Sequence, residues 1–290
     1  MSAGRPTTVF DALDRTPLSY AILIAYVLLA IWTDPMNPST LMLVEHGAAA
    51  GMLVQDGEPW RLLTAAFLHG GLLHLGLNSY ALYWIGPQLE ARLGTLRFGL
   101  LYVVSAVFGN VVAVTGMAPA QLLVGGSGAL FGMFGAAIAL MSRQGRTQLD
   151  FLESHGGRQL LGLVVANLAI GLFVPMISNS AHVGGLVSGF VLTFLFLERG
   201  RIGADGISRA AQAGWLALFA GLTLYACFPV LRWDYQMRRI AEARATGDTG
   251  TARAWLGAVR GRLTIYSDLG SNEVWGERGR EILDRWMHDD

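Results

Sequence analysis

The chain has 290 residues and a formal net charge of zero, and 53% of its residues are hydrophobic whereas 14% are charged. That balance is far from the composition of a soluble domain of this length and indicates a polytopic membrane protein. The basic residues are arginines and histidines without a long cationic run, so the usual signal of a nucleic-acid partner is missing. Cys227 is the single cysteine, so an internal disulfide is excluded, and it lies in an apolar stretch.

Seven apolar stretches are spread along the chain. A bilayer core of about 30 Å requires about 20 mostly apolar residues per helix, and each stretch meets or approaches that length. The first is interpreted as a helix and not as a signal peptide, because further apolar stretches follow it instead of a cleavage site. The predicted membrane helices are Leu18–Trp32, Gly71–Leu89, Phe98–Gly116, Ser127–Met141, Leu160–Val174, Ala181–Leu197 and Ala213–Leu231.

The sequence therefore predicts an all-α fold in four parts. An N-terminal cytoplasmic segment is expected at 1–17 and a six-helix core at 18–200. A linker with the seventh helix follows at 201–231, and a polar helical tail at 232–290.

Arginine placement predicts the orientation, because short cytoplasmic loops of membrane proteins are enriched in Lys and Arg. With the N-terminus inside, the inner segments carry ten arginines, whereas the outer loops of the first six helices carry only Arg61. We therefore expect a multi-pass protein of the cell (inner) membrane with a cytoplasmic N-terminus. The seventh helix then runs outward and places the tail from about Arg232 on the outer face.

The stretch Val124–Ala136 carries a lone hydroxyl, that of Ser127, among glycines. From Ser127 this helix reaches the inner-side Arg143 after about 15 residues, which is roughly 22 Å and too short to cross the hydrocarbon layer. Ser127 is therefore predicted to begin the helix about 8 Å below the outer surface, where irregular backbone needs a protein interior or a wet cavity. We interpret Ser127 as a nucleophile inside the membrane.

His182 is the second residue of the sixth predicted helix, which runs parallel to the fourth and therefore starts on the same side as Ser127. Small residues form a stripe on each of these helices and allow close approach in a membrane. The stripes are Gly128, Gly132 and Gly135 on the fourth helix and Gly185 and Gly189 on the sixth. Close backbones would bring the imidazole within hydrogen-bond reach of the Ser127 hydroxyl, as a general base and its nucleophile require.

The second predicted helix supplies His74 and Asn78, which are four residues apart and share one face. Polar groups at membrane depth are expensive and usually face a bundle interior or cavity. An Asn amide beside the Ser127 N–H would form an oxyanion hole, and we assign that role to Asn78 with assistance from His74.

These motifs resemble those of the rhomboid intramembrane serine proteases over about Leu18 to Leu197. The resemblance rests on G-x-S-G around Ser127, A-H-x-x-G-x-x-x-G around His182, H-x-x-x-N at His74 and Asn78, and an outer-loop Trp60-Arg61 pair. It implies a six-helix catalytic core and a Ser127–His182 dyad without a carboxylate. It also implies an oxyanion hole formed by Asn78, His74 and the Ser127 N–H. The seventh helix resembles the six-plus-one arrangement of some bacterial rhomboids.

The resemblance also bears on residues around the pair. Trp60 and Arg61 are implied to belong to a structural, membrane-dipping loop. Gly125 is expected to contribute to close packing around the site, as the glycine stripes do. Phe131 stands where several relatives have a tyrosine, so stacking on His182 would survive without the hydroxyl.

Taken singly, each polar residue is more often structural, and only their coincidence at one depth favours catalysis. A zinc site of His69, His74 and His182 is another reading. Against it, H-E-x-x-H is absent, and the five-residue spacing of His69 and His74 places them on different faces of a helix.

The resulting prediction is a protease that cleaves transmembrane protein substrates within or near the outer half of the bilayer, without cofactor or metal. Its expected partners are those substrates and the lipid bilayer, with no nucleic acid, and the sequence leaves the oligomeric state open. Two alternatives remain: a catalytically silent rhomboid-like binder of membrane helices, and a channel or transporter, which usually shows repeated halves that this chain lacks.

Overall fold

A computed structural model describes residues 15–55, 57–116, 122–143, 155–173, 177–197 and 206–227, and from the tail 239–243, 245–248 and 250. The chain divides into two compact units, Met1–Cys227 and Phe228–Asp290. In the second unit, residues 239–243 are helical, and the remainder of the predicted helical tail lies outside the described residues.

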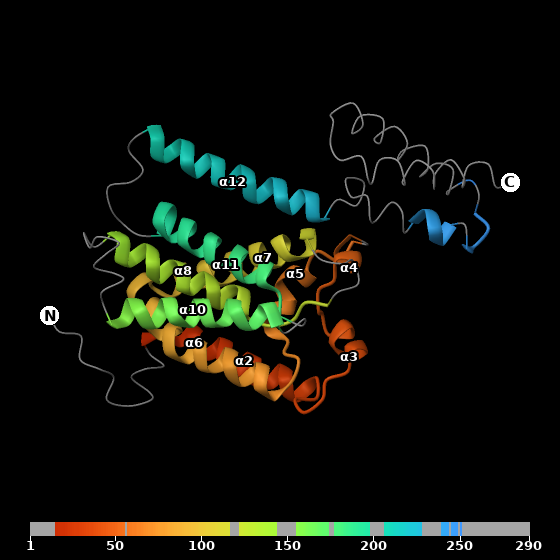
Figure 1. Ribbon diagram of the computed structural model, residues 1–290, viewed down its shortest axis with the longest axis horizontal. Helices are drawn as coiled ribbons and strands as arrows, with labels where there is room; N and C mark the ends of the chain where they lie inside the picture. Colours follow the sequence, from red (N-terminus) through yellow and green to blue (C-terminus); the bar gives the residue numbers. More distant parts are fainter. Residues whose placement is uncertain are drawn as a thin grey trace. The chain divides into compact units, whose positions relative to one another are not determined.

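The first unit is built from long helices that run in roughly one direction, with shorter helices gathered at one end (Figure 1). The long helices are α2 (Pro17–Trp32), α6 (Leu72–Leu93), α7 (Thr95–Gly116), α8 (Ser127–Arg143), α10 (His155–Phe173), α11 (Asn179–Leu192) and α12 (Gly206–Cys227). The short ones are α3 (Thr40–Glu45), α4 (Gly51–Gln55), α5 (Arg61–Thr64) and the 3-10 turn η1 (Ala65–Phe67), and a π-helical turn, η2 (Thr193–Leu197), continues α11. Each predicted membrane helix coincides with one long helix, which confirms the all-α prediction.

The predicted boundaries are furthest from the observed ones at two helix starts. α12 begins at Gly206 and not at Ala213, and α10 begins at His155 and not at Leu160. Hydropathy marks the part of a helix that crosses the membrane, whereas helical hydrogen bonding continues through the flanking polar residues such as Arg209 and Gln212. The predicted end of the seventh helix at Leu231 lies outside the described residues.

Three described helices are long and apolar enough to cross a membrane, namely Thr95–Thr115, Asn179–Leu197 with its π-turn, and Arg209–Cys227. Pro17–Trp32, Ser127–Met141 and Arg158–Phe173 are shorter apolar helices. Large apolar side chains such as Leu73, Leu172 and Phe173 are exposed on the outside of the unit. Such surfaces suit lipid, so the unit is a polytopic membrane protein.

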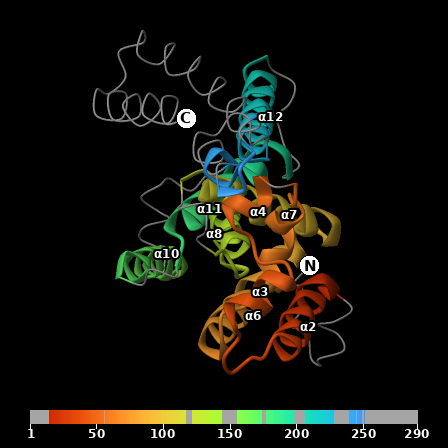
Figure 2. The ribbon, with the colours of Figure 1, turned by 90° about the vertical axis from the view of Figure 1, so that its right-hand side faces the viewer.

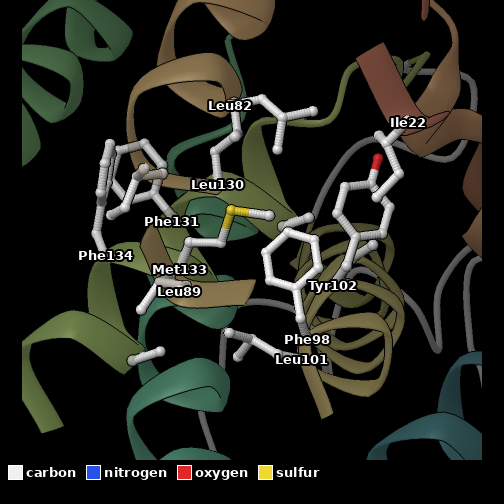
Figure 3. Packing of buried hydrophobic residues seen from close by; sticks show 14 of the residues in the cluster. Ile22, Leu82, Leu89, Phe98, Leu101, Tyr102, Leu130, Phe131, Met133 and Phe134 are labelled. Atoms are coloured by element: carbon white, nitrogen blue, oxygen red, sulfur yellow. The ribbon is translucent and has the colours of Figure 1, made fainter. Parts of the chain in front are cut away.

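α8 packs against α7 and α11, and Figure 2 shows α10 to the left of α8 and α11, with α6 and α2 below them. The main apolar cluster lies where α6, α7 and α8 meet, and Figure 3 shows these side chains pointing toward one another. They include Leu82 and Leu89 of α6, Phe98, Leu101 and Tyr102 of α7, and Leu130, Phe131, Met133 and Phe134 of α8. The start of α8 therefore rests on a packed core.

A buried carboxyl group attaches α2 to α6. Glu90 is 1% exposed and accepts hydrogen bonds from the Leu18 N–H at 3.0 Å, the Ser19 N–H at 2.7 Å and the Ser19 hydroxyl at 2.7 Å. The first N–H groups of a helix have no partner within the helix, so Glu90 satisfies two of them in α2 from a neighbouring helix. The Thr95 hydroxyl donates to the same carboxyl group at 2.9 Å.

The connection between α2 and α6 is organised by Arg61. Its guanidinium donates to the carbonyl oxygens of Val44 at 2.5 Å and Ala48 at 3.0 Å, and it pairs with Glu58. It also lies 4.5 Å from the centre of the Trp60 ring. Arg61 is 7% exposed and Trp60 47% exposed, so the arginine holds the loop together while the indole faces outward.

Candidate active site

The loop that leads into α8 is fixed to the connection between α2 and α6. Ala49 and Leu123 exchange two backbone hydrogen bonds, of 3.1 and 2.7 Å, and the Gly125 N–H donates to the Ala65 carbonyl at 2.9 Å. Gly125 has φ +117°, a conformation that only glycine adopts without strain. α8 begins directly after this loop, at Ser127, as predicted.

Ser127 and His182 are in hydrogen-bond contact. The Nε2 atom of His182 lies 2.9 Å from the Ser127 Oγ, although 55 residues separate the two in sequence. His182 stands in the first turn of α11, which is capped by the Ser178 hydroxyl, and it is 4% exposed. Ser127 is half-buried. A nucleophile and its base require this distance.

The other imidazole nitrogen, Nδ1 of His182, is buried without a hydrogen-bond partner among the described residues. Among the described residues, no carboxylate therefore donates or accepts at this nitrogen, which is where the third member of a catalytic triad would bind. For Nε2 to accept the Ser127 proton, the ring hydrogen must be on Nδ1.

Glycines of α8 and α11 set the distance between the two helices. A Cβ atom added at Gly185 would overlap the Gly128 carbonyl oxygen, and one at Gly189 would overlap that of Gly132. At Gly135 it would overlap the Leu186 carbonyl oxygen, and at Gly132 the Ser105 side chain. The stripes predicted from the sequence thus lie backbone to backbone, and we call this contact the glycine seam.

Phe131 stacks on His182. The ring centres are 4.1 Å apart and the planes are inclined by 8°. Phe131 follows Ser127 by one helical turn, so the ring that stacks on His182 and the Ser127 hydroxyl come from the same helix. Stacking holds the imidazole plane in the orientation that points Nε2 at Ser127.

His74 and Asn78 converge on the loop before Ser127. A Cβ built on Gly125 would lie 2.6 Å from the His74 Nε2 and 3.7 Å from the Asn78 Nδ2. Asn78 is 5% exposed and donates one amide hydrogen to the His74 carbonyl oxygen at 3.1 Å, so its second amide hydrogen is available to another acceptor. Gly125 precedes α8 and makes room for the imidazole, so it acts in the loop and not in helix packing.

An aromatic group behind this loop was not identified from the sequence. His69 is 2% exposed, and its ring lies 4.6 Å from that of Tyr26 and 5.2 Å from that of His74. The Tyr26 and Tyr102 hydroxyls are 2.8 Å apart, and a Cβ at Gly126 would overlap the Tyr26 hydroxyl. In the sequence, Tyr26 and Tyr102 appear only as tyrosines within apolar helices, which does not indicate their partners.

The placement of His69 corrects one argument from the sequence. α6 begins at Leu72, so His69 lies outside the helix and approaches His74, whereas the five-residue spacing predicts that the two side chains lie on different faces of one helix. The described residues nevertheless contain no group of three His, Cys, Asp or Glu side chains arranged to hold a metal ion.

The chain has relatives among known proteins. This is a multi-pass, all-α membrane chain with a serine and a histidine in contact, and a model of the Rhomboid domain matches its residues 56–199. Rhomboid-like protease 1 of Toxoplasma gondii is 33% identical over 205 residues, which cover 68% of this chain and 67% of the relative. The chain belongs to the rhomboid family.

Two further relatives show how far the similarity extends. RHOMBOID-like protein 5 of Arabidopsis thaliana is 39% identical over 171 residues, which cover 58% of this chain and 54% of that protein. Rhomboid protease GluP of Bacillus subtilis is 34% identical over 206 residues, covering 70% of this chain and 38% of the relative. The chain thus spans about half the length of several relatives it matches.

Proposed function

We propose that this protein is an intramembrane serine endopeptidase that cleaves transmembrane protein substrates within or near the outer half of the bilayer. The observation that carries the proposal is the 2.9 Å contact between the Ser127 Oγ and the His182 Nε2. Membership of the rhomboid family supports it, as do relatives named as proteases in Bacillus subtilis and Toxoplasma gondii.

In the proposed reaction, His182 takes the proton of the Ser127 hydroxyl as the oxygen attacks the carbonyl carbon of a substrate peptide bond. The carbonyl oxygen becomes negatively charged and accepts hydrogen bonds from Asn78, His74 and the Ser127 N–H. The C–N bond then breaks, and protonated His182 gives its proton to the leaving amine. Water, with His182 again as base, hydrolyses the acyl-enzyme and returns Ser127 to its hydroxyl form.

The proposed setting is the inner cell membrane, with the N-terminus in the cytoplasm and the C-terminal tail on the outer face. The excess of arginine in the predicted inner segments supports this orientation. We assign the catalytic core to 18–200, with 1–17 as a cytoplasmic segment, 201–231 as linker and seventh helix, and 232–290 as a polar tail.

The test is cleavage of a model single-span substrate by the purified full chain in detergent, combined with labelling by a fluorophosphonate. Wild type is expected to cleave and to be labelled, whereas Ser127→Ala and His182→Ala do neither. Ser188→Ala is the matched control, because Ser188 is a buried serine of α11 outside the site, and it should keep both activities. Asn78→Ala and His74→Ala should still fold but lose roughly 10²–10³ in kcat.

Retained cleavage in Ser127→Ala would disprove the nucleophile assignment. A wild-type protein that neither cleaves nor labels across a panel of substrates, yet retains transmembrane peptides on a column, would instead identify a catalytically silent binder of membrane helices.

A further inference from the structure

A cavity of about 630 Å³ lies at the end of the first unit where α6 passes into α7. Its lining consists of Arg92, Leu93, Gly94, Thr95, Leu96, Arg97, Leu140 and Leu197. Leu140 follows Ser127 by 13 positions in α8, which is about 20 Å along the helix. The cavity is therefore distinct from the candidate active site.

The helices place this cavity at a membrane boundary. The apolar span of α7 begins at Thr95, and the span formed by α11 and its π-turn ends at Leu197. Both residues line the cavity. A cavity at the ends of two spans opens at the level of lipid headgroups and has hydrocarbon on its other side.

The lining of the cavity has an apolar part and a cationic part. Leu93, Leu140 and Leu197 are at most 7% exposed and form an apolar floor, whereas Arg92 is exposed and Arg97 half-buried. None of the eight described lining residues is acidic. The nearby carboxyl group of Glu90 is 1% exposed and accepts hydrogen bonds from the Leu18 and Ser19 N–H groups, from the Ser19 hydroxyl and from the hydroxyl of Thr95, which lines the cavity.

Arginine side chains at the boundary of a membrane bind phosphate through paired N–H groups, and basic pockets between membrane helices hold lipid headgroups. We propose that this cavity binds an anionic phospholipid, with its phosphate at Arg92 and Arg97 and the start of an acyl chain on the leucine floor. Free inorganic phosphate would use the same arginines and leave the apolar floor unfilled. The exposed side chain of Leu96, at 78%, extends the apolar path toward the bilayer.

The test uses the delipidated full chain in detergent, titrated with phosphatidylglycerol, phosphatidylcholine or inorganic phosphate and followed by native mass spectrometry. Phosphatidylglycerol is expected to bind at one preferred site. Arg92→Gln/Arg97→Gln should weaken that binding about 25-fold, because each arginine contributes a factor of about five near anionic lipid. Arg158→Gln/Arg209→Gln is the matched control, since it removes the same charge from exposed residues at the starts of α10 and α12.

The control variant should bind phosphatidylglycerol as wild type does. Equal loss in both double variants would show diffuse surface attraction and overturn the site, and so would equal binding of phosphatidylcholine. Displacement of the lipid by millimolar inorganic phosphate would establish a free anion as the ligand and overturn the lipid assignment. Arg92→Lys/Arg97→Lys keeps the charge and should recover part of the affinity, which separates lost contacts from a misfolded cavity. None of these outcomes depends on proteolytic activity.

Discussion

α10 and α11 both contact α8, but they are attached in different ways. α11 meets α8 through the glycine seam, where Gly185 and Gly189 lie against backbone carbonyl groups. On α10, a Cβ added at Gly162 would meet nothing within 4 Å, and Leu172 and Phe173 are 77% and 84% exposed. The proposed catalytic pair therefore bridges the tightest helix contact, while the neighbouring helix is held loosely.

This contrast shows where precision is needed. A nucleophile and its base must stay within about 3 Å of each other, and a displacement of 1 Å is costly in rate. Backbone-to-backbone packing has little freedom to adjust, because no flexible side chains lie between the helices. α10 carries no residue of the proposed dyad or oxyanion hole, so the same constraint does not apply to it.

The largest effect is expected from a methyl group in the glycine seam. Gly189→Ala places a Cβ on the Gly132 carbonyl oxygen, so the helices must separate, and the free energy of unfolding should fall by about 3 kcal/mol. Separation also lengthens the contact between Ser127 and His182, so cleavage should fall more than tenfold. Both quantities are measured on the purified protein in detergent.

Gly162→Ala is the matched control on α10. The added methyl group enters open space, and alanine has the higher helix propensity, so stability should be unchanged or rise by up to about 1 kcal/mol. Equal destabilisation by the two substitutions would contradict the difference between α10 and α11.

α2 offers a third kind of attachment, which depends on one buried polar group. Glu90→Gln keeps the volume but weakens the acceptor for Leu18 and Ser19, so the free energy of unfolding should fall by about 2 kcal/mol. Glu45→Gln, at an exposed position of α3, should change it by less than about 0.5 kcal/mol. A small effect at Glu90 would show that apolar contacts alone hold α2.

The ring of Phe131 stacked on the imidazole allows a test within the candidate active site. Phe131→Leu removes the ring that lies 4.1 Å from His182, so kcat should fall about three- to tenfold with KM unchanged. Phe134→Leu is the control, since Phe134 packs against Phe131 and belongs to the same buried cluster. If both variants lose the same activity, Phe131 acts through core packing and not through orientation of the imidazole.

Much of this arrangement follows from the sequence because membrane helices are long, apolar and constrained in length. The helix that begins at Ser127 and the glycine stripes were predicted from spacing alone, since small residues in a membrane helix indicate close packing. The starts of α10 and α12 were misplaced, because polar residues extend a helix beyond its apolar part.

The sequence does not reveal partners that meet through tertiary packing. Glu90 appears in it only as a charged residue near a helix end, yet it holds the first turn of α2. The contacts of Tyr26 with His69 and Tyr102 join segments more than 40 positions apart. Short helices such as α3 and α4 also escape prediction, because they are too brief to show a hydrophobic period.

The smallest expected effect concerns the attachment of α10. The Asn179 amide of α11 donates to the Leu168 carbonyl of α10 at 3.0 Å, a hydrogen bond that joins the two helices. Asn179→Ala should therefore raise amide exchange within α10 about fivefold, which corresponds to about 1 kcal/mol, and leave α8 and α11 unchanged. Asn167→Ala provides the control, because the Asn167 amide donates to Leu163 within α10 itself. If exchange rises in α8 as well, the two helices open as one unit, and α10 is not independent of the glycine seam.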